Sequence, residues 1–179
     1  MCQKNDLATR LWNEDIAQKY SNPDKCMDHL LEQYKLYVEM ADRISARRAM
    51  ANTFFLTVNT LMVAGMAAYL EKMAARITLL APLAGLILCY VWQRLIRSYR
   101  QLNRGKYKVI GEMEKRLPCS PYWSAEWTAL GEGKDPKKYK PLTAVEVWVP
   151  VVFMALYTLL AVVITKQYWL GLLKACWAS

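Results

Sequence analysis

The stretch AMANTFFLTVNTLMVAGMAAYL, residues 49–70, decides the fold class because it is apolar over 22 residues and carries no charge. At about 1.5 Å of rise per residue, a helix of this length crosses a hydrocarbon core of about 30 Å. Residues 77–96 and 144–165 are two further apolar stretches, with charge only near their ends. The sequence therefore predicts an all-α integral membrane protein with three transmembrane helices.

Apolar and charged residues are separated along the chain. Hydrophobic residues make up 55% and charged residues 22%, and the mean hydropathy of +0.02 conceals this separation. Lys and Arg crowd the ends of the apolar stretches, and no RNA- or DNA-binding motif accompanies the net charge of +9. We therefore predict no nucleic-acid partner, and we expect the cations to set the topology and to face anionic lipid headgroups on the cytosolic side.

Lys and Arg are distributed asymmetrically about the three apolar stretches. Eight precede residue 49, twelve lie in 94–140, and four remain for the other side of the membrane. Short loops rich in Lys and Arg stay in the cytosol. The sequence therefore predicts a cytosolic N-terminus and a C-terminus on the opposite side.

A long helix is expected to lead into the first span. Asn22 and Pro23 form a helix start, since Asn accepts a backbone N–H and Pro has no donor to leave unpaired. Apolar residues then recur at steps of four and three, which predicts a seam for a partner helix. This seam consists of Leu30, Tyr34, Tyr37, Ala41 and Ile44. No helix breaker follows it, so one helix should run from the cytosol into the bilayer.

The second span should leave the membrane in the same way. Basic residues follow it, and a heptad-like spacing continues from Ile96 to Leu117. The first two spans are therefore predicted to form a long hairpin that extends into the cytosol. The expected organisation is cytosolic N-terminal helices at 1–48, a transmembrane hairpin at 49–96, a basic cytosolic helical extension and loop at 97–143, a third transmembrane helix at 144–165 and a C-terminal tail at 166–179.

Two residues near the start of the third span have specific expectations. Glu146 lies at the membrane entry, and we predict an ion pair with an arginine at the end of the second span, Arg94 or Arg97. Pro150 falls within the first two turns and is expected to kink the helix, which membrane helices tolerate when neighbours satisfy the freed carbonyl.

Asn52 and Asn59 are the polar residues that most need an explanation in the first span. They are seven residues apart and share one helix face. Interhelical hydrogen bonds, worth about 1 kcal/mol or less each on average, are the first interpretation. We therefore predict that both asparagines, together with the seam, form helix-packing or oligomer contacts. A polar pore lining is the alternative.

The residue types that carry chemistry form no catalytic or metal-binding pattern. The five cysteines are scattered, and His29 has one cysteine a helical turn away, which gives too few ligands for a zinc site. Glu112 and Glu114 point to different faces of a helix and do not form an acid–base pair. The sequence predicts that the protein is not an enzyme and holds no cofactor.

Three parts of the chain resemble the RipA family of small bacterial cytoplasmic-membrane proteins. They are RRAMANTFFLTVNT at 47–60, SYRQLNRGKYKVIGEMEKRLP at 98–118, and YWSAEW at 122–127 with KYKPLTAVEVWVPVVFMALY at 138–157. The resemblance covers most of residues 30–160. It implies a bacterial inner membrane with a periplasmic C-terminal tail, homo-oligomeric and octameric assembly, and, in an intracellular pathogen, growth inside host cells.

The leading functional hypothesis is a homo-oligomeric inner-membrane scaffold. Its cytosolic helical arms would recruit or organise a cytosolic protein partner in envelope homeostasis or intracellular survival. The alternative is an oligomeric channel or membrane-permeabilising effector, similar in layout to short two-span effectors of bacterial antiviral systems. A polar stripe facing a central axis would favour the channel, and an apolar axis with exposed arms would favour the scaffold.

Overall fold

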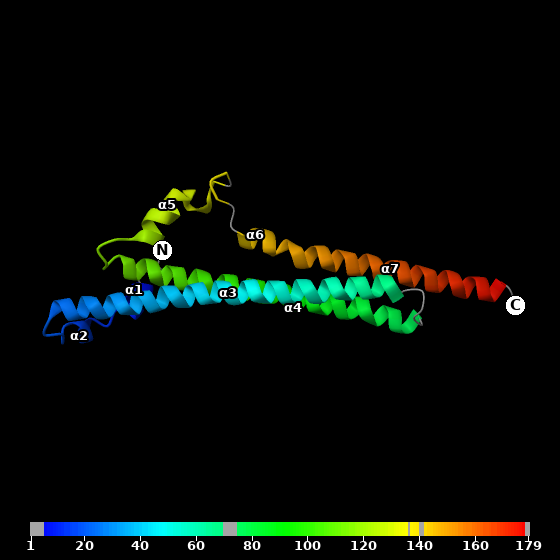
Figure 1. The fold of residues 1–179 in the computed structure, drawn as a ribbon, viewed down its shortest axis with the longest axis horizontal. Helices are drawn as coiled ribbons and strands as arrows, with labels where there is room; N and C mark the ends of the chain where they lie inside the picture. Colours follow the sequence, from blue (N-terminus) through cyan, green and yellow to red (C-terminus); the bar gives the residue numbers. More distant parts are fainter. Residues whose placement is uncertain (1–5, 70–74, 136, 140–141, 178–179) are drawn as a thin grey trace. The chain divides into compact units, whose positions relative to one another are not determined.

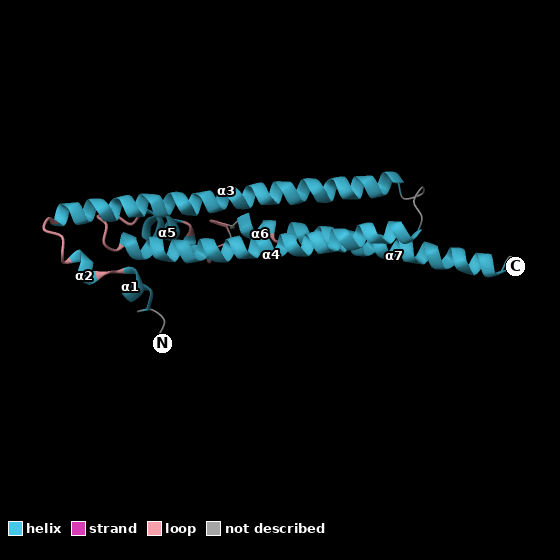
Figure 2. Cartoon of the chain, turned by 90° about the horizontal axis from the view of Figure 1, so that it is seen from below, coloured by secondary structure: helices cyan, strands magenta, loops and turns pink. Residues whose placement is uncertain are grey.

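The computed structural model describes residues 6–69, 75–135, 137–139 and 142–177. Across these ranges the chain forms helices and turns and no strand (Figure 2), and three helices are long and apolar enough to cross a membrane. The predicted all-α class with three spans is confirmed. The elements are α1 Asp6–Leu11, α2 Glu14–Ala17, α3 Pro23–Tyr69, α4 Ala75–Glu114, the π-helix η1 Pro121–Glu126, α5 Trp127–Ala129, the 3-10 helix η2 Gly131–Gly133, α6 Leu142–Glu146 and α7 Trp148–Trp177.

Helix α3 begins where the sequence predicts. The side-chain oxygen of Asn22 accepts the backbone N–H of Asp24 at 2.8 Å, and Pro23 is the first helical residue. The helix then continues without interruption for 47 residues. One helix therefore contains both the predicted seam and the first apolar stretch.

The chain divides into two compact units, which we name for their content. The arm unit consists of Met1–Arg47 and Tyr99–Pro141, and the span unit consists of Arg48–Ser98 and Leu142–Ser179. Both units contain parts of α3 and α4, which pair as an antiparallel hairpin in each (Figure 1). The predicted long hairpin is thus confirmed.

The core of the span unit is made by α3, α4 and α7. Phe55 of α3 stacks on Trp92 of α4 with ring centroids 5.7 Å apart, and Phe153 of α7 packs against the same tryptophan. A second cluster joins Met66 and Cys89 to Tyr157, whose side chain is fully buried. The three apolar helices therefore pack as one bundle within a single protomer.

The core of the arm unit follows the predicted seam. Ala41 and Ile44 of α3 are buried, as are Ile110 and Met113 of α4, and Leu30, Tyr34 and Tyr37 are half-buried. Asn103 donates a hydrogen bond to the hydroxyl of Ser45 at 3.0 Å across the hairpin. The seam is therefore covered by α4 of the same chain.

The third span starts with a break on the N-terminal side of Pro150, the proline that was expected to kink it. Helix α6 ends at Glu146, Val147 forms a turn, and α7 starts at Trp148. Pro150 has no N–H for the carbonyl of Glu146 and its ring would collide with that carbonyl, so the helix is interrupted before the proline. From Trp148 the helix continues to Trp177 and includes residues 166–177 of the predicted C-terminal tail.

The short elements of the arm unit follow their sequence signals. The predicted N-terminal helices before α3 are α1 and α2, which are separated at Trp12 and Asn13. Ser120 accepts the backbone N–H of Ser124 at 3.2 Å and caps η1. The segment that follows ends at Gly131, whose φ of 70° is readily available to glycine.

Candidate functional site

One asparagine connects all three spans. The hydroxyl of Tyr157 donates to Oδ1 of Asn59 at 3.0 Å, and Sγ of Cys89 donates to the same oxygen at 3.2 Å. The amide nitrogen of Asn59 donates to the backbone carbonyl of Phe55 at 2.7 Å. Asn59 is 0% exposed, so its polar group is buried and hydrogen-bonded on both sides. This network ties α3, α4 and α7 together inside one subunit.

Asn52 makes the corresponding contact two turns earlier. Its Oδ1 accepts the indole N–H of Trp92 at 2.9 Å. Both asparagines therefore take part in helix packing within the protomer, where the sequence analysis also considered oligomer contacts and a pore lining. The complete burial of Asn59 leaves it unavailable for either of those two roles.

The threonines on the outer face of α3 have their hydrogen bonds satisfied locally. The hydroxyl of Thr53 donates to the carbonyl of Ala49 at 3.1 Å, and that of Thr60 donates to the carbonyl of Leu56 at 2.8 Å. Such bonds to the carbonyl four residues earlier remove the cost of placing a hydroxyl in lipid. This face therefore needs no polar partner.

Glu146 is paired with Arg48 of α3, whereas the sequence analysis favoured Arg94 or Arg97. Nε of Arg48 lies 3.3 Å from Oε2 of Glu146, and the two side chains are 14% and 15% exposed. The two atoms are not aligned as a hydrogen bond, so the contact is a Coulombic one. Arg94 and Arg97 have exposed side chains on α4. The helix break before Pro150 ends α6 at Glu146, and the carboxylate there faces α3.

A buried carboxylate organises the arm unit. Glu114 is 1% exposed, and four donors surround its carboxylate. Oε1 accepts from the Tyr34 hydroxyl at 2.9 Å and from the Tyr122 backbone N–H at 3.1 Å. Oε2 accepts from the Ser120 hydroxyl at 2.6 Å and from the Trp123 backbone N–H at 2.9 Å. The donors come from α3 and from the start of η1. One side chain at the end of α4 therefore holds both.

The electrostatics of Glu114 favour its ionised form. Burial alone would raise the pKa of this carboxyl, but the hydrogen bonds from Ser120, Trp123, Tyr122 and Tyr34 outweigh burial and lower the pKa below its ordinary value. The pKa of Tyr34 is raised by burial and by its hydrogen bond to Glu114. Tyr34 therefore remains a neutral donor to a carboxylate at physiological pH.

Sequence reasoning missed the Glu114 cluster because it considered the residue only as half of an acid–base pair. A signal was present. Glu114 lies one helical turn after the buried Ile110 and six residues before the Ser120-Pro121 helix start. A carboxylate at a core position close to a helix start has backbone N–H groups within reach.

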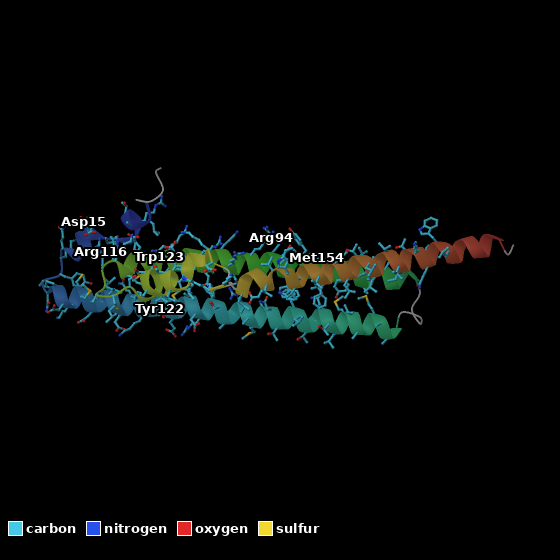
Figure 3. All side chains as sticks on the ribbon, turned by 90° about the horizontal axis from the view of Figure 1, so that it is seen from above. Asp15, Arg94, Arg116, Tyr122, Trp123 and Met154 are labelled. Atoms are coloured by element: carbon cyan, nitrogen blue, oxygen red, sulfur yellow. The ribbon has the colours of Figure 1, made fainter. Side chains whose placement is uncertain are left out.

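Arg116 fastens the N-terminal helices to the end of α4 (Figure 3). Its guanidinium carbon lies 3.8 Å from the ring centroid of Trp12, and the guanidinium also forms an ion pair with Glu14. On the next segment, Tyr20 and His29 share a hydrogen bond of 2.9 Å. Trp12 therefore packs against the same chain.

The comparisons with known proteins concern the region that contains both hairpin arms and all three spans. Residues 31–166 match the family model described as the octameric membrane protein family (8xMP). The chain belongs to the octameric membrane protein family. Neither the curated proteins nor the solved structures compared with the chain contain a match.

Membership of the octameric membrane protein family supports self-association of this chain. It also confirms the resemblance to a family of small octameric membrane proteins. The match begins at Leu31, so α1 and α2 lie outside the part of the chain that the octameric membrane protein family shares.

Proposed function

We propose that the chain is a homo-oligomeric scaffold of the bacterial inner membrane, with a cytosolic N-terminus and a periplasmic C-terminus. In this proposal the arm unit organises a cytosolic protein partner in envelope homeostasis or intracellular survival, and the protein catalyses no reaction. The membrane location and self-association come from the family. The biological setting comes from the resemblance to the RipA family.

The observation that carries the proposal is the closure of the span network inside the protomer. Asn59, which is fully buried in the span unit, accepts hydrogen bonds from Cys89 and Tyr157 of the same protomer. A channel built from these helices would need polar side chains free to face a pathway. Here the asparagines stabilise the bundle, which favours a structural role for the spans.

The arm unit offers a surface suited to a protein partner. The Glu114 cluster fixes the start of η1, from which Trp123 and Trp127 are 44% and 42% exposed. Exposed tryptophans on a rigid element are typical of protein–protein contacts. The same unit also has a groove of about 520 Å³ whose lining includes Tyr34, Tyr107 and Tyr122.

The basic residues of α4 at the end of the predicted second span and after it support contact with lipid headgroups. Arg94, Arg97 and Arg104 are exposed on α4. Arginines next to a membrane span are attracted to anionic lipids by about 1 kcal/mol each. We propose these residues as the headgroup contacts on the cytosolic side.

The test that separates scaffold from channel uses the purified full chain in liposomes. Vesicles of anionic phospholipid with K⁺ and proton gradients are compared with and without protein at several protein-to-lipid ratios. The scaffold proposal expects leak rates equal to those of empty vesicles. A leak that rises with protein content and is selective among ions would overturn it and support the channel.

A second test addresses the arm surface. Trp127→Ser removes an exposed ring, and Tyr168→Ser, a 39% exposed aromatic of α7, is the control for a general loss of aromatic surface. The variants are expressed in the source bacterium lacking its own copy. The proposal expects loss of envelope integrity or intracellular growth for Trp127→Ser with unchanged native mass. Full activity of Trp127→Ser would contradict a role for this surface.

A further inference from the structure

Three aliphatic side chains lie exposed on one edge of the hairpin in the arm unit. Leu36 and Met40 of α3 are 57% and 42% exposed, and Leu102 of α4 is 51% exposed. The Lys106 ammonium lies 4.3 Å from the ring centroid of Tyr37. Lys106 follows Leu102 by one turn, and Met40 follows Tyr37 by three residues and Leu36 by four, so this contact marks the edge that the three share. We call Leu36, Met40 and Leu102 the aliphatic edge.

Lipid does not account for the aliphatic edge. Ten of the 25 residues from Asp24 to Arg48 are charged, as are six of the 15 from Arg94 to Lys108. Charged side chains at this density are excluded from a hydrocarbon core. The edge therefore faces water, where a cluster of exposed aliphatic side chains indicates a contact surface.

The opposite edge of the same hairpin carries a groove of about 520 Å³. Its lining includes Tyr34, Val38, Tyr107, Ile110 and Tyr122. A helix turns through about 200° in two residues, so Val38 points away from Leu36 and Met40. The arm unit thus has an exposed apolar edge on one side and a partly apolar groove on the other.

The charges beside the two surfaces are complementary. Arg47 lies two turns after Met40 on the same face of α3 and is exposed, and Asp42 lines the groove. None of the ion pairs found in the described ranges uses either residue. A cation beside the edge and an anion in the groove would attract each other in a contact in which the edge enters the groove.

A ring of identical subunits needs two different surfaces that fit each other. A head-to-tail contact repeats around a closed ring, whereas a self-complementary contact stops at a dimer. The seam and both asparagines already pack against other helices of the same protomer, so they do not supply these surfaces. Between lipid-embedded helices the hydrophobic effect gives no driving force, but on a surface in water it does.

We propose that the aliphatic edge of one subunit docks in the tyrosine-lined groove of the next copy of this chain. The occupant is a second copy because the family is octameric and its match, 31–166, contains every residue of the edge and the groove. The proposal rests on the self-association of the family and is independent of the scaffold function.

Disulfide cross-linking in membranes tests the pairing directly. Cys2, Cys26, Cys119 and Cys176 are first replaced by Ser, while Cys89, which is buried in the span unit, is kept. Chains with Met40→Cys are co-expressed with chains carrying Tyr107→Cys, and the membranes are oxidised. A covalent dimer is expected only in the mixture. The control replaces Lys108, exposed on the neighbouring face of α4, by Cys in place of Tyr107.

The native mass of the full chain in nanodiscs is the second measurement. Leu36→Ser with Met40→Ser should raise the dissociation constant of the assembly by about tenfold or more, since burial of two aliphatic side chains is lost. Asp28→Ser with Glu32→Ser, exposed on the outer face of the same helix, should leave the mass unchanged. Circular dichroism verifies that the variants keep their helix content.

Three outcomes would overturn the proposal. A dimer from Met40→Cys chains alone would show a self-complementary contact. Cross-linking at Lys108 but not at Tyr107 would place the contact elsewhere on α4. An unchanged native mass for the aliphatic variant would show that a different partner, or none, covers the edge.

Discussion

The ring of Tyr157 on α7 occupies the space that a side chain on Gly85 of α4 would need. A Cβ built at Gly85 falls well inside van der Waals contact with three atoms of that ring. The same tyrosine donates to Asn59 at 3.0 Å. The close approach of two helices and one hydrogen bond therefore depend on each other.

Replacing this glycine is expected to loosen the three-helix bundle. Gly85→Ala forces the Tyr157 ring to move, and overpacking of this kind costs about 1–3 kcal/mol. Gly65→Ala is the control, because a Cβ there meets nothing within 4 Å and alanine favours a helix over glycine by about 1 kcal/mol. Thermal unfolding in detergent should show a lower midpoint for Gly85→Ala only. If Gly85→Ala unfolded at the same temperature as the unaltered protein, the Tyr157 ring could move away from α4 without a loss of stability.

Removal of the tyrosine hydroxyl is expected to have a small, specific effect. Tyr157→Phe keeps the ring against Gly85 and deletes the donor to Asn59. Hydrogen bonds between membrane helices contribute about 0.6 kcal/mol on average. A double-mutant cycle with Asn59→Ala should therefore give a coupling energy of about this size. Additive effects would show that the two groups do not interact in the bilayer.

The Glu114 cluster is expected to make the arm unit sensitive to acid. The pKa of Glu114 is below its ordinary value of 4.5, so its contribution to stability is complete above that value and is lost as the pH falls through the lower, folded-state pKa. Unfolding followed by tryptophan fluorescence, to which Trp123 of the cluster contributes, should show this loss between neutral and strongly acidic pH.

Glu114→Gln should remove that acid dependence. The amide brings a donor toward four donors, and unsatisfied buried groups of this kind cost about 1–3 kcal/mol. Glu112→Gln is the control, since Glu112 forms an ion pair with the exposed Lys115 at 2.5 Å and lies outside the cluster. Cleavage by a protease between residues 115 and 121 should increase for Glu114→Gln. The same increase in Glu112→Gln would point to a general effect of charge.

The pairing of Arg48 with Glu146 predicts rescue by exchange of charges. Arg48→Glu or Glu146→Arg alone places like charges together at two side chains that are about 15% exposed, and each should lower stability by about 1–3 kcal/mol after allowance for the remaining exposure. The double exchange should recover most of this loss. Glu146→Arg with Arg94→Glu should not. Rescue through Arg94 would restore the partner that the sequence alone favoured.

The contacts of Arg116 with Trp12 and Glu14 predict that its removal releases the N-terminal helices α1 and α2. Arg116→Ala removes both the stacking on Trp12 and the ion pair with Glu14. Amide hydrogen exchange should accelerate over α1 and α2 and stay unchanged in α3. Lys115→Ala, one residue away, is the control. If α1 and α2 exchanged at the same rate in Arg116→Ala and Lys115→Ala, contacts other than those of Arg116 would hold them in place.

The sequence by itself determined the three spans, the hairpin and the start of α3. Each of these depends on local composition: an uncharged stretch must leave water, and Asn22 with Pro23 starts a helix whatever lies around it. The seam was also predictable, because its period is a property of the helix alone. The family match then supplied the self-association that no local pattern encodes.

Only the tertiary structure decided which partner each polar side chain takes. A helical period shows that Asn59 faces a neighbour, but not that Cys89 and Tyr157 are that neighbour. The break at Val147 directed Glu146 to Arg48, and the turn after α4 brought two backbone N–H groups to Glu114. The contacts of Asn59 and Glu146 join residues 30 to 98 positions apart. Their choice depends on how whole helices pack, which is set by the sum of many weak side-chain contacts.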